Sequence, residues 1–278
     1  MKTLGLFVVG FILYSLSLTG GIDTARAEIP AISEDTTVYF YNSETNINNF
    51  ASLKMAFDTG LAQLGNMQFQ PFSNRDTFEE LVASQKDGVF LLSSWHYRLL
   101  KKQWPLKPVL VGTVQGRTSQ SKVLSVNSSI GDIDALKGMR IASSGSEDYT
   151  RTVLERILGG RSGDILDHVK WVLVPKDLDA LMALGFGMAD AALTAESSLD
   201  SLAKINVKQY NRLKRIGTSQ QQLLMLGVIS ESARPNTLHA VERLTGVANI
   251  SLEGGNALRM LGLDGFRKLT AAELKELE

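Results

Sequence analysis

The stretch Leu136–Leu158, LKGMRIASSGSEDYTRTVLERIL, joins three local patterns that together decide the fold class. Residues 139–142 predict a buried strand, and residues 149–158 predict a helix with its apolar side chains on one face. A small polar loop lies between the two. A strand that leads through such a loop into a helix is typical of α/β proteins, in which ligands bind beyond the ends of the strands.

The loop contributes Ser144, Gly145 and Ser146, which we predict to form an anion cradle. The first backbone N–H groups of a helix have no partner within the helix, and the helix dipole favours negative charge there. Serine hydroxyls add hydrogen-bond donors without bulk. The alternative is an ordinary capped turn, in which Ser146 caps the helix and Glu147 and Asp148 occupy its first turn.

The N-terminus has the features of a cleavable signal peptide over residues 1–27. It holds a basic start at Lys2, an apolar run over residues 4–18 and a small-residue cleavage pattern, Ala25-Arg26-Ala27. A membrane anchor is the alternative, although the apolar run is shorter than the roughly 20 residues of a spanning helix. We therefore expect an exported protein that is not embedded in the membrane after cleavage.

The composition excludes several classes of protein. No cysteine is present to form disulfides, act as a nucleophile or carry a lipid, which favours a soluble protein of a closed periplasm. Lys+Arg and Asp+Glu number 29 each, so no nucleic-acid partner is expected. The three histidines, His96, His168 and His239, do not have the spacing of metal ligands. The sequence also contains no nucleophile elbow and no phosphate-binding loop. We expect a monomer with no metal, no cofactor and no enzymatic activity.

Strand and helix patterns alternate along the rest of the chain. Strands are predicted at 37–41, 67–72, 88–92, 109–114, 122–126, 139–142, 168–174, 189–193, 213–216 and 221–229. Helices are predicted at 50–64, 76–83, 95–102, 132–137, 149–158, 177–184, 197–204, 235–244, 257–261 and 271–277. We predict an α/β protein of two lobes, each a mixed, mostly parallel sheet flanked by helices, with two hinge strands. Lobe 1 would hold residues 28–118 and 220–278, and lobe 2 residues 119–219.

Ligands of such sheets lie beyond the carboxyl ends of the strands. The polar loops predicted there in lobe 1 span residues 42–46, 73–75 and 93–97, which makes Asn42 and Ser94 candidate ligand contacts. Each loop could instead be a surface turn, and the aromatic residues of 93–97 could instead pack in the core. The hinges would let the lobes close over a ligand.

Three motifs resemble a known family. They are DGVFL before SSWHY within residues 87–97, DALKGMRIA at residues 134–142 before the serine loop, and GMADAA at residues 187–192. With them, nearly the whole mature chain resembles the PhnD-like phosphate, phosphite and phosphonate periplasmic substrate-binding proteins. That resemblance implies a type II periplasmic binding protein fold.

The resemblance also implies ligand contacts. Tyr97 would be an aromatic wall from lobe 1, and residues 144–146 would be the anion cradle of lobe 2. Asp190 would bind an amine or hydroxyl of the ligand or hold the cleft wall in place. Relatives often carry a histidine where Asp177 stands here, at the start of helix 177–184. We include Asp177 among the candidate ligand contacts.

Acidic residues depart from the family pattern. If Glu147, Asp148, Asp177 and Asp190 all lie near one cleft, they would repel a doubly charged anion. A zwitterion, an amine or a cation would then suit the cleft better than a phosphonate. Alternatively, Glu147 and Asp148 cap the helix and face water.

The function implied is that of a periplasmic solute-binding protein of an ABC importer. It would bind a small polar or anionic ligand, phosphate- or phosphonate-like, in the inter-lobe cleft and deliver it to the membrane permease. The alternative is a periplasmic sensor or interaction subunit that signals to a membrane kinase or a redox complex, because fold does not fix function. A periplasmic hydrolase is a third hypothesis, for which no catalytic constellation is found.

Overall fold

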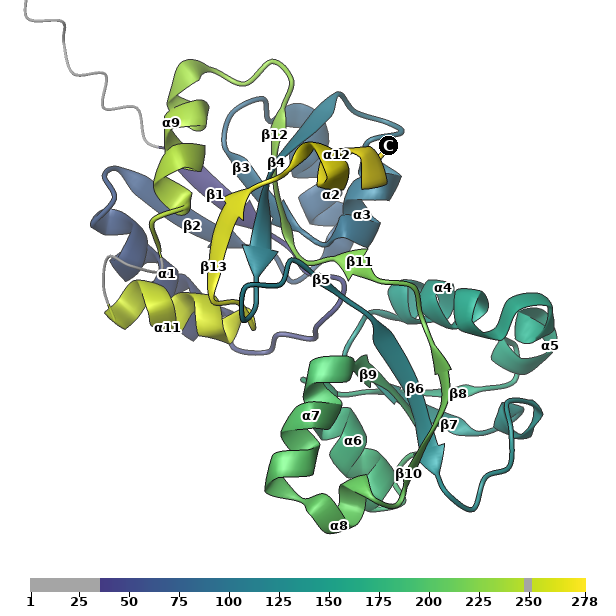
Figure 1. Cartoon of the computed structure of the whole chain (residues 1–278). Helices are drawn as coiled ribbons and strands as arrows, with labels where there is room; N and C mark the ends of the chain where they lie inside the picture. The colour runs from purple at the N-terminus through teal and green to yellow at the C-terminus, as the bar shows by residue number, and fades with distance from the viewer. Residues whose placement is uncertain (1–35, 248–251) are drawn as a thin grey trace, which may run out of the picture. The chain divides into compact units, whose positions relative to one another are not determined.

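The computed structural model describes residues 36–247 and 252–278, so the predicted signal peptide lies outside the described residues. Helices and strands alternate along the chain, and the strands form two larger sheets, which confirms the predicted α/β class (Figure 1). In the described part of the chain, no helix combines the length and the apolar character needed to cross a membrane.

The first sheet has six strands in the order β13-β4-β12-β3-β1-β2. The strands β1, β2 and β3 are parallel, whereas β12, β4 and β13 pair antiparallel with their neighbours. The bounds are β1 (Thr36–Phe40), β2 (Met67–Pro71), β3 (Val89–Leu92), β4 (Leu106–Thr113), β12 (Leu226–Ser230) and β13 (Gly265–Lys268).

The second sheet has five strands in the order β10-β6-β9-β7-β8. β7 pairs parallel with β8 and β9, and β6 pairs antiparallel with β9 and β10. The bounds are β6 (Lys122–Asn127), β7 (Arg140–Ser143), β8 (Lys170–Leu173), β9 (Ala191–Ala195) and β10 (Leu213–Thr218). The chain crosses between the two sheets through a two-stranded ribbon, β5 (Ser119–Gln120) and β11 (Gln222–Leu223).

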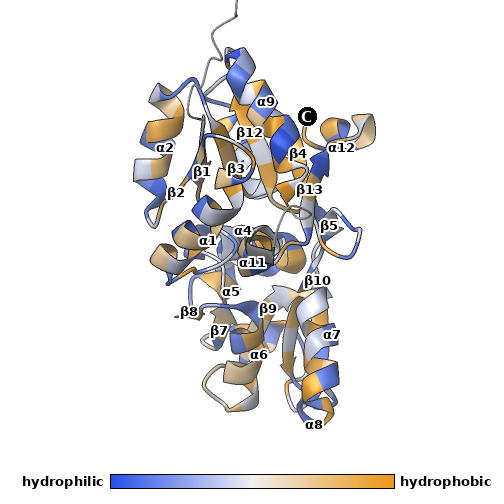
Figure 2. Cartoon of the chain, turned by 90° about the vertical axis from the view of Figure 1, so that its left-hand side faces the viewer, coloured by the Kyte–Doolittle hydropathy of each residue, from blue (hydrophilic) through white to orange (hydrophobic). Residues whose placement is uncertain are grey.

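Both faces of the six-stranded sheet are covered by helices. Along β3, Val89 and Leu91 belong to the core formed with α1, α9 and α11, whereas Phe90 and Leu92 belong to the core formed with α2 and α3. Figure 2 shows β12 in hydrophobic colours and α9 with both hydrophobic and polar residues. The bounds are α1 (Phe50–Ala62), α2 (Arg75–Ser84), α3 (Ser94–Leu100), α9 (Pro235–Leu244), α11 (Leu252–Met260) and α12 (Ala271–Glu276).

The five-stranded sheet is covered in the same way. Residues of α4 and α5 form one core with Leu124, Ile141 and Leu193, and residues of α6 and α7 form another with Val123 and Ala142. The bounds are η1 (Asp134–Leu136), α4 (Glu147–Leu158), η2 (Gly159–Arg161), α5 (Ser162–Leu166), α6 (Asp177–Gly185), α7 (Glu196–Ile205) and α8 (Val207–Tyr210). Strands buried on both faces read as continuous apolar runs, which is why the sequence revealed them.

Two predicted strands are corrected. The single strand at 221–229 is wrong, because this segment first pairs with β5 as β11 and then, as β12, inserts between β3 and β4. The strand predicted at 109–114 begins earlier and runs through Pro108. A register shift between Gly227 and Val228 on the paired strand accommodates this proline, since a β-bulge tolerates the missing donor.

The helix α12 is fastened to the sheet by Glu273. Its carboxylate lies 2.6 Å from the Arg267 guanidinium of β13 and accepts a hydrogen bond of 2.6 Å from the Thr118 hydroxyl. It also closes a capping box with Thr270. These contacts, led by the hydrogen bond from Arg267, lower the pKa of Glu273 to about 2. The ionised carboxylate therefore links α12 to β13 and to Thr118, the residue before β5.

We expect Glu273→Gln to lower the free energy of unfolding by about 1–2 kcal/mol at neutral pH, because charged hydrogen bonds are lost. The folded pKa is depressed, so this stability is present above the ordinary value of 4.5 and is lost as pH falls towards about 2. Urea unfolding should thus show a difference that shrinks between neutral pH and about pH 3. Glu276→Gln, on the same helix but more exposed, is the control. Equal losses of unfolding free energy in both variants would contradict the stabilising role of the Glu273 carboxylate.

Candidate functional site

The serine loop, Ser143–Ser146, joins β7 to α4. Ser146 is the N-cap residue of α4, and its Oγ accepts a hydrogen bond of 3.4 Å from the Tyr149 backbone N–H. The capped turn considered from the sequence is therefore present. The first two residues of the helix, Glu147 and Asp148, donate no backbone hydrogen bond to any residue that the structure describes. A cap and free N–H donors coexist here, since a helix start leaves several donors unpaired.

The serine loop contacts the loop that follows β1. The Ser146 backbone N–H donates to the Ser43 carbonyl at 2.8 Å, and the Ser144 hydroxyl lies 3.1 Å from the Glu44 carbonyl. The Gly145 N–H donates to the Ser143 hydroxyl at 3.2 Å. Two loops, each at the carboxyl end of a strand in a different sheet, are thus joined directly by hydrogen bonds.

A cavity of about 240 Å³ lies where these two loops meet. Its walls combine aromatic rings with amide and hydroxyl groups, and none of its lining residues is charged. The lining residues are Phe40, Tyr41, Asn42, Thr45, Asn46, Ile47, Phe50, Phe72, Ser73, Ser144, Ser146 and Leu173. The structure therefore brings the predicted residues Asn42, Ser144 and Ser146 together at one cavity. A mostly apolar wall with a few convergent polar groups is the usual composition of a small-molecule site.

Asp177 lies directly behind the serine loop. Its Oδ1 is 2.5 Å from the Ser144 hydroxyl, and its Oδ2 is 3.1 Å from the Lys122 ammonium and 2.5 Å from the Ala195 N–H. The side chains of Lys122 and Asp177 are 8% and 12% exposed. Burial lowers the pKa of Lys122, but Asp177 and Glu44 more than offset this effect, so the pKa is raised overall. Lys122 is therefore a charged ammonium in the interior.

Glu44, like Lys122, is a residue of this region that the sequence analysis did not single out. The residue is only 8% exposed, and its carboxylate accepts a hydrogen bond of 3.3 Å from the Gln120 amide. Burial raises the pKa of Glu44, and Lys122 opposes that rise. A charged residue in a polar loop is usually solvated, so only the tertiary fold could show that this carboxylate is enclosed.

The remaining predicted residues lie elsewhere. Tyr97 is buried in the core of the six-stranded sheet, with its hydroxyl 3.5 Å from the Leu106 carbonyl. Ser94 is also buried and donates to the Leu223 carbonyl at 2.7 Å. Asp190 pairs with Arg140 at 2.8 Å, and the hydrogen bond from this arginine is the main cause of its lowered pKa. None of the three lines the 240 Å³ cavity.

An ion pair also joins α2 and α4 beside the serine loop. Arg75, at the start of α2, lies 3.0 Å from the Asp148 carboxylate and 2.6 Å from that of Glu79. Its guanidinium stands 5.4 Å from the ring centroid of Trp95. Arg75 is therefore shared between two carboxylates, those of Asp148 and Glu79.

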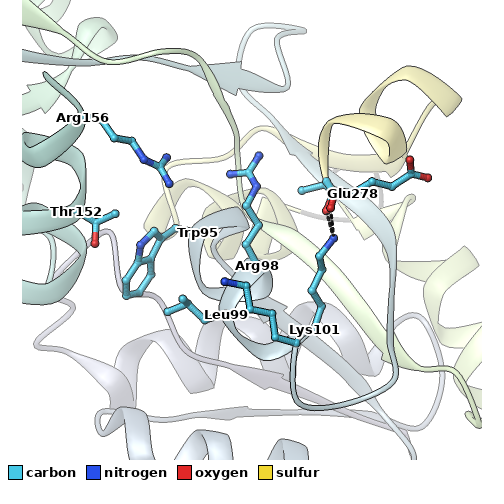
Figure 3. A pocket seen from close by; sticks show the side chains of 9 residues that line it. Trp95, Arg98, Leu99, Lys101, Thr152, Arg156 and Glu278 are labelled. Atoms are coloured by element: carbon cyan, nitrogen blue, oxygen red, sulfur yellow. Dashed lines mark hydrogen bonds between the residues drawn. The ribbon is translucent and has the colours of Figure 1, made fainter. Parts of the chain in front are cut away.

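A second cavity, of about 400 Å³, lies between α3 and α4. Figure 3 shows Arg156 and Arg98 beside Trp95, and Lys101 hydrogen-bonded to Glu278 at 2.9 Å. No residue of the predicted ligand set lines this cavity. It therefore does not combine the serine loop with the loop after β1, which the 240 Å³ cavity does.

Comparisons with known proteins place the chain in a family. No curated protein sequence matches it. Its fold is similar to that of XAC2383 from Xanthomonas citri, with a TM-score of 0.62 at 13% identity over 87% of this chain and 94% of that one. A binding protein component of an ABC phosphonate transporter from Pseudomonas aeruginosa gives 0.61 at 12% over 88% and 86%. PhnD1 from Prochlorococcus marinus, in complex with methylphosphonate, gives 0.58 at 14% over 87% and 96%.

These structural likenesses confirm the predicted type II periplasmic binding protein fold. The sequence profile described as "ABC transporter, phosphonate, periplasmic substrate-binding protein" matches residues 47–274, which is most of the chain. The match covers the serine loop and every strand of the two sheets except β1, which precedes residue 47. The chain therefore belongs to the family of periplasmic substrate-binding proteins of phosphonate ABC transporters.

Proposed function

We propose that this chain binds a small polar or anionic, phosphonate-like ligand at the 240 Å³ cavity and delivers it to the membrane permease of an ABC importer. The observation that carries the proposal is the convergence of Ser144 and Ser146 with Asn42 on one cavity. These residues come from loops at the carboxyl ends of β7 and β1, where ligands of α/β proteins bind. The free N–H groups at the start of α4 add donors suited to an oxyanion.

Ligand entry requires an exchange of hydrogen bonds. The Ser146 N–H and the Ser144 hydroxyl now face the carbonyl oxygens of Ser43 and Glu44. We propose that residues 28–118 and 220–278 form one lobe and residues 119–219 the other, with β5 and β11 as hinge strands. Opening about these hinges separates the two loops, and ligand oxygens then take the place of the carbonyl oxygens.

The wider setting follows from the family. We propose that residues 1–27 are cleaved on export and that the mature chain is a soluble periplasmic monomer with no nucleic-acid partner. It acts as a carrier and not as an enzyme. Within residues 36–247 and 252–278, no group of three potential metal ligands clusters, and we propose no metal or cofactor. The comparisons do not favour the alternative of a sensor or interaction subunit.

The test is calorimetric titration of the full mature chain with inorganic phosphate, methylphosphonate, methanesulfonate and neutral polar metabolites. For an oxyanion that binds, the double variant Ser144→Ala with Ser146→Ala should lose at least about tenfold in affinity, because hydrogen bonds to a charged group are removed. Titration below the melting temperature of each variant separates this loss from the weaker capping of α4.

The matched control removes two hydroxyls from an exposed helix. Ser197→Ala with Ser201→Ala changes α7, where the Ser201 hydroxyl bonds only its own helix backbone, and should leave the affinity unchanged. Equal affinities in the wild type and the Ser144/Ser146 variant would assign those serines to structure alone. If none of the compounds binds the wild type at millimolar concentration, the proposed function fails.

A further inference from the structure

We propose that Glu44 is a charge-selectivity residue, which makes the 240 Å³ cavity favour singly charged over doubly charged oxyanions. The inference rests on the proposed function, because it concerns the ligand of the same cavity. Glu44 is not a lining residue of that cavity. The charge of Glu44 therefore acts on a bound ligand at a distance, across the residues that line the cavity.

The first step is the position of Glu44. Its backbone N–H donates to the side-chain carbonyl of Asn42 at 2.9 Å, and its backbone carbonyl lies 3.1 Å from the Ser144 hydroxyl. Asn42 and Ser144 both line the cavity, as does the adjacent residue, Thr45. Glu44 is thus in direct contact with two polar groups of the cavity wall.

The second step is the charge of its surroundings. The groups that face Glu44 are Lys122 of β6, Asp177 of α6, Tyr149 of α4 and Gln120 of β5. The two carboxylates and one ammonium leave a net charge of −1 in a buried cluster when all three are ionised. Salt and water screen buried charges poorly, so this charge acts on the cavity with little attenuation.

The third step concerns the charged residues nearest the cavity. The cavity has no charged lining residue. Asp148 at the start of α4 lies 3.0 Å from Arg75, which also pairs with Glu79 at 2.6 Å, and both Asp148 and Glu147 are exposed to water. Each negative charge on a ligand therefore meets the field of the Glu44 cluster, and a second charge doubles the repulsion.

The experiment uses two ligands of nearly the same shape and different charge. Methanesulfonate carries one negative charge, and methylphosphonate carries two at about pH 9. Calorimetric titration at that pH should give the wild type a lower affinity for methylphosphonate. Glu44→Gln should raise the affinity for methylphosphonate by about tenfold and that for methanesulfonate by less, so the ratio between the two ligands changes.

The control is Glu155→Gln, which removes the same charge from an exposed position of α4 and should leave the ratio unchanged. If Glu44→Gln does not fold, Asp177→Asn removes one charge from the same cluster and should shift the ratio in the same direction. A ratio that stays constant in the folded variant would overturn the role of Glu44 while the proposed function stands. No binding of either ligand by the wild type or the variant would overturn both.

Discussion

Replacing Lys122 with methionine is expected to lower the free energy of unfolding by about 3–5 kcal/mol, since it removes one partner of a buried ion pair. The Lys122 ammonium lies 3.1 Å from Asp177, and its side chain is 8% exposed. Methionine fills a similar volume, so the loss reports charge and not packing. Without the ammonium, Asp177 and Glu44 remain as two buried carboxylates with no cation beside them.

Urea unfolding of both proteins measures this effect. The deficit should shrink as pH falls from neutral towards 4.5, the ordinary value for a glutamate, because burial already raises the pKa of Glu44 and the variant raises it further. A protonated carboxyl group no longer needs a cation. The control is Lys54→Met, which breaks an exposed ion pair of 2.8 Å with Asp58 and should cost less than about 1 kcal/mol. A similarly small loss for Lys122→Met would mean that water, and not Lys122, solvates the carboxylates.

Gly145→Ala is expected to damage both the stability and the ligand site. An added Cβ would lie 2.5 Å from Cδ1 of Tyr149 and 3.2 Å from the Thr150 hydroxyl. Tyr149 is 2% exposed and its ring packs against that of Trp95 at 5.7 Å, so we expect the serine loop to move. We expect a loss of about 1–3 kcal/mol from overpacking. Ligand affinity should fall at least about tenfold, because Ser144 and Ser146 are displaced together.

The matched control is Gly160→Ala, where an added Cβ meets nothing within 4 Å. It should leave both stability and ligand affinity within experimental error. Thermal melts and calorimetric titration distinguish the two variants. If Gly145→Ala melted like the wild type and bound the same compounds equally well, the serine loop would be more adaptable than its packing against Tyr149 implies.

Much of the architecture could be predicted from local patterns. The apolar run at β3 and the one-sided helix at α4 encode their own conformations, since burial on a strand or a helix face repeats with a fixed period. By contrast, β13 is a four-residue strand that carries Arg267 and Lys268, and its sequence has no such signal. The break between β11 and β12 was also missed, because it depends on which strands the segment pairs with.

The candidate site was predictable only where position along the chain implies position in space. Residues at the carboxyl ends of β1 and β7 were expected at the ligand site, and Asn42 and Ser144 do meet at one cavity. The sequence does not, however, predict the direction in which a side chain points. Tyr97 points into the core, and Asp190 is held by Arg140 on the neighbouring strand. Whether Asp190 and Tyr97 contact a ligand stays a prediction that the cavity does not support.

Local sequence patterns were enough to predict the α/β class, the serine loop and the family resemblance, because these depend on periodicity and on motifs within short segments. By contrast, the folded chain alone shows that Glu44, Lys122 and Asp177 share one buried cluster behind Ser144. These residues are far apart in the chain, and nothing local to any of them specifies the others. Their charges interact strongly because the fold removes water from between them, and that removal is a property of the assembled molecule.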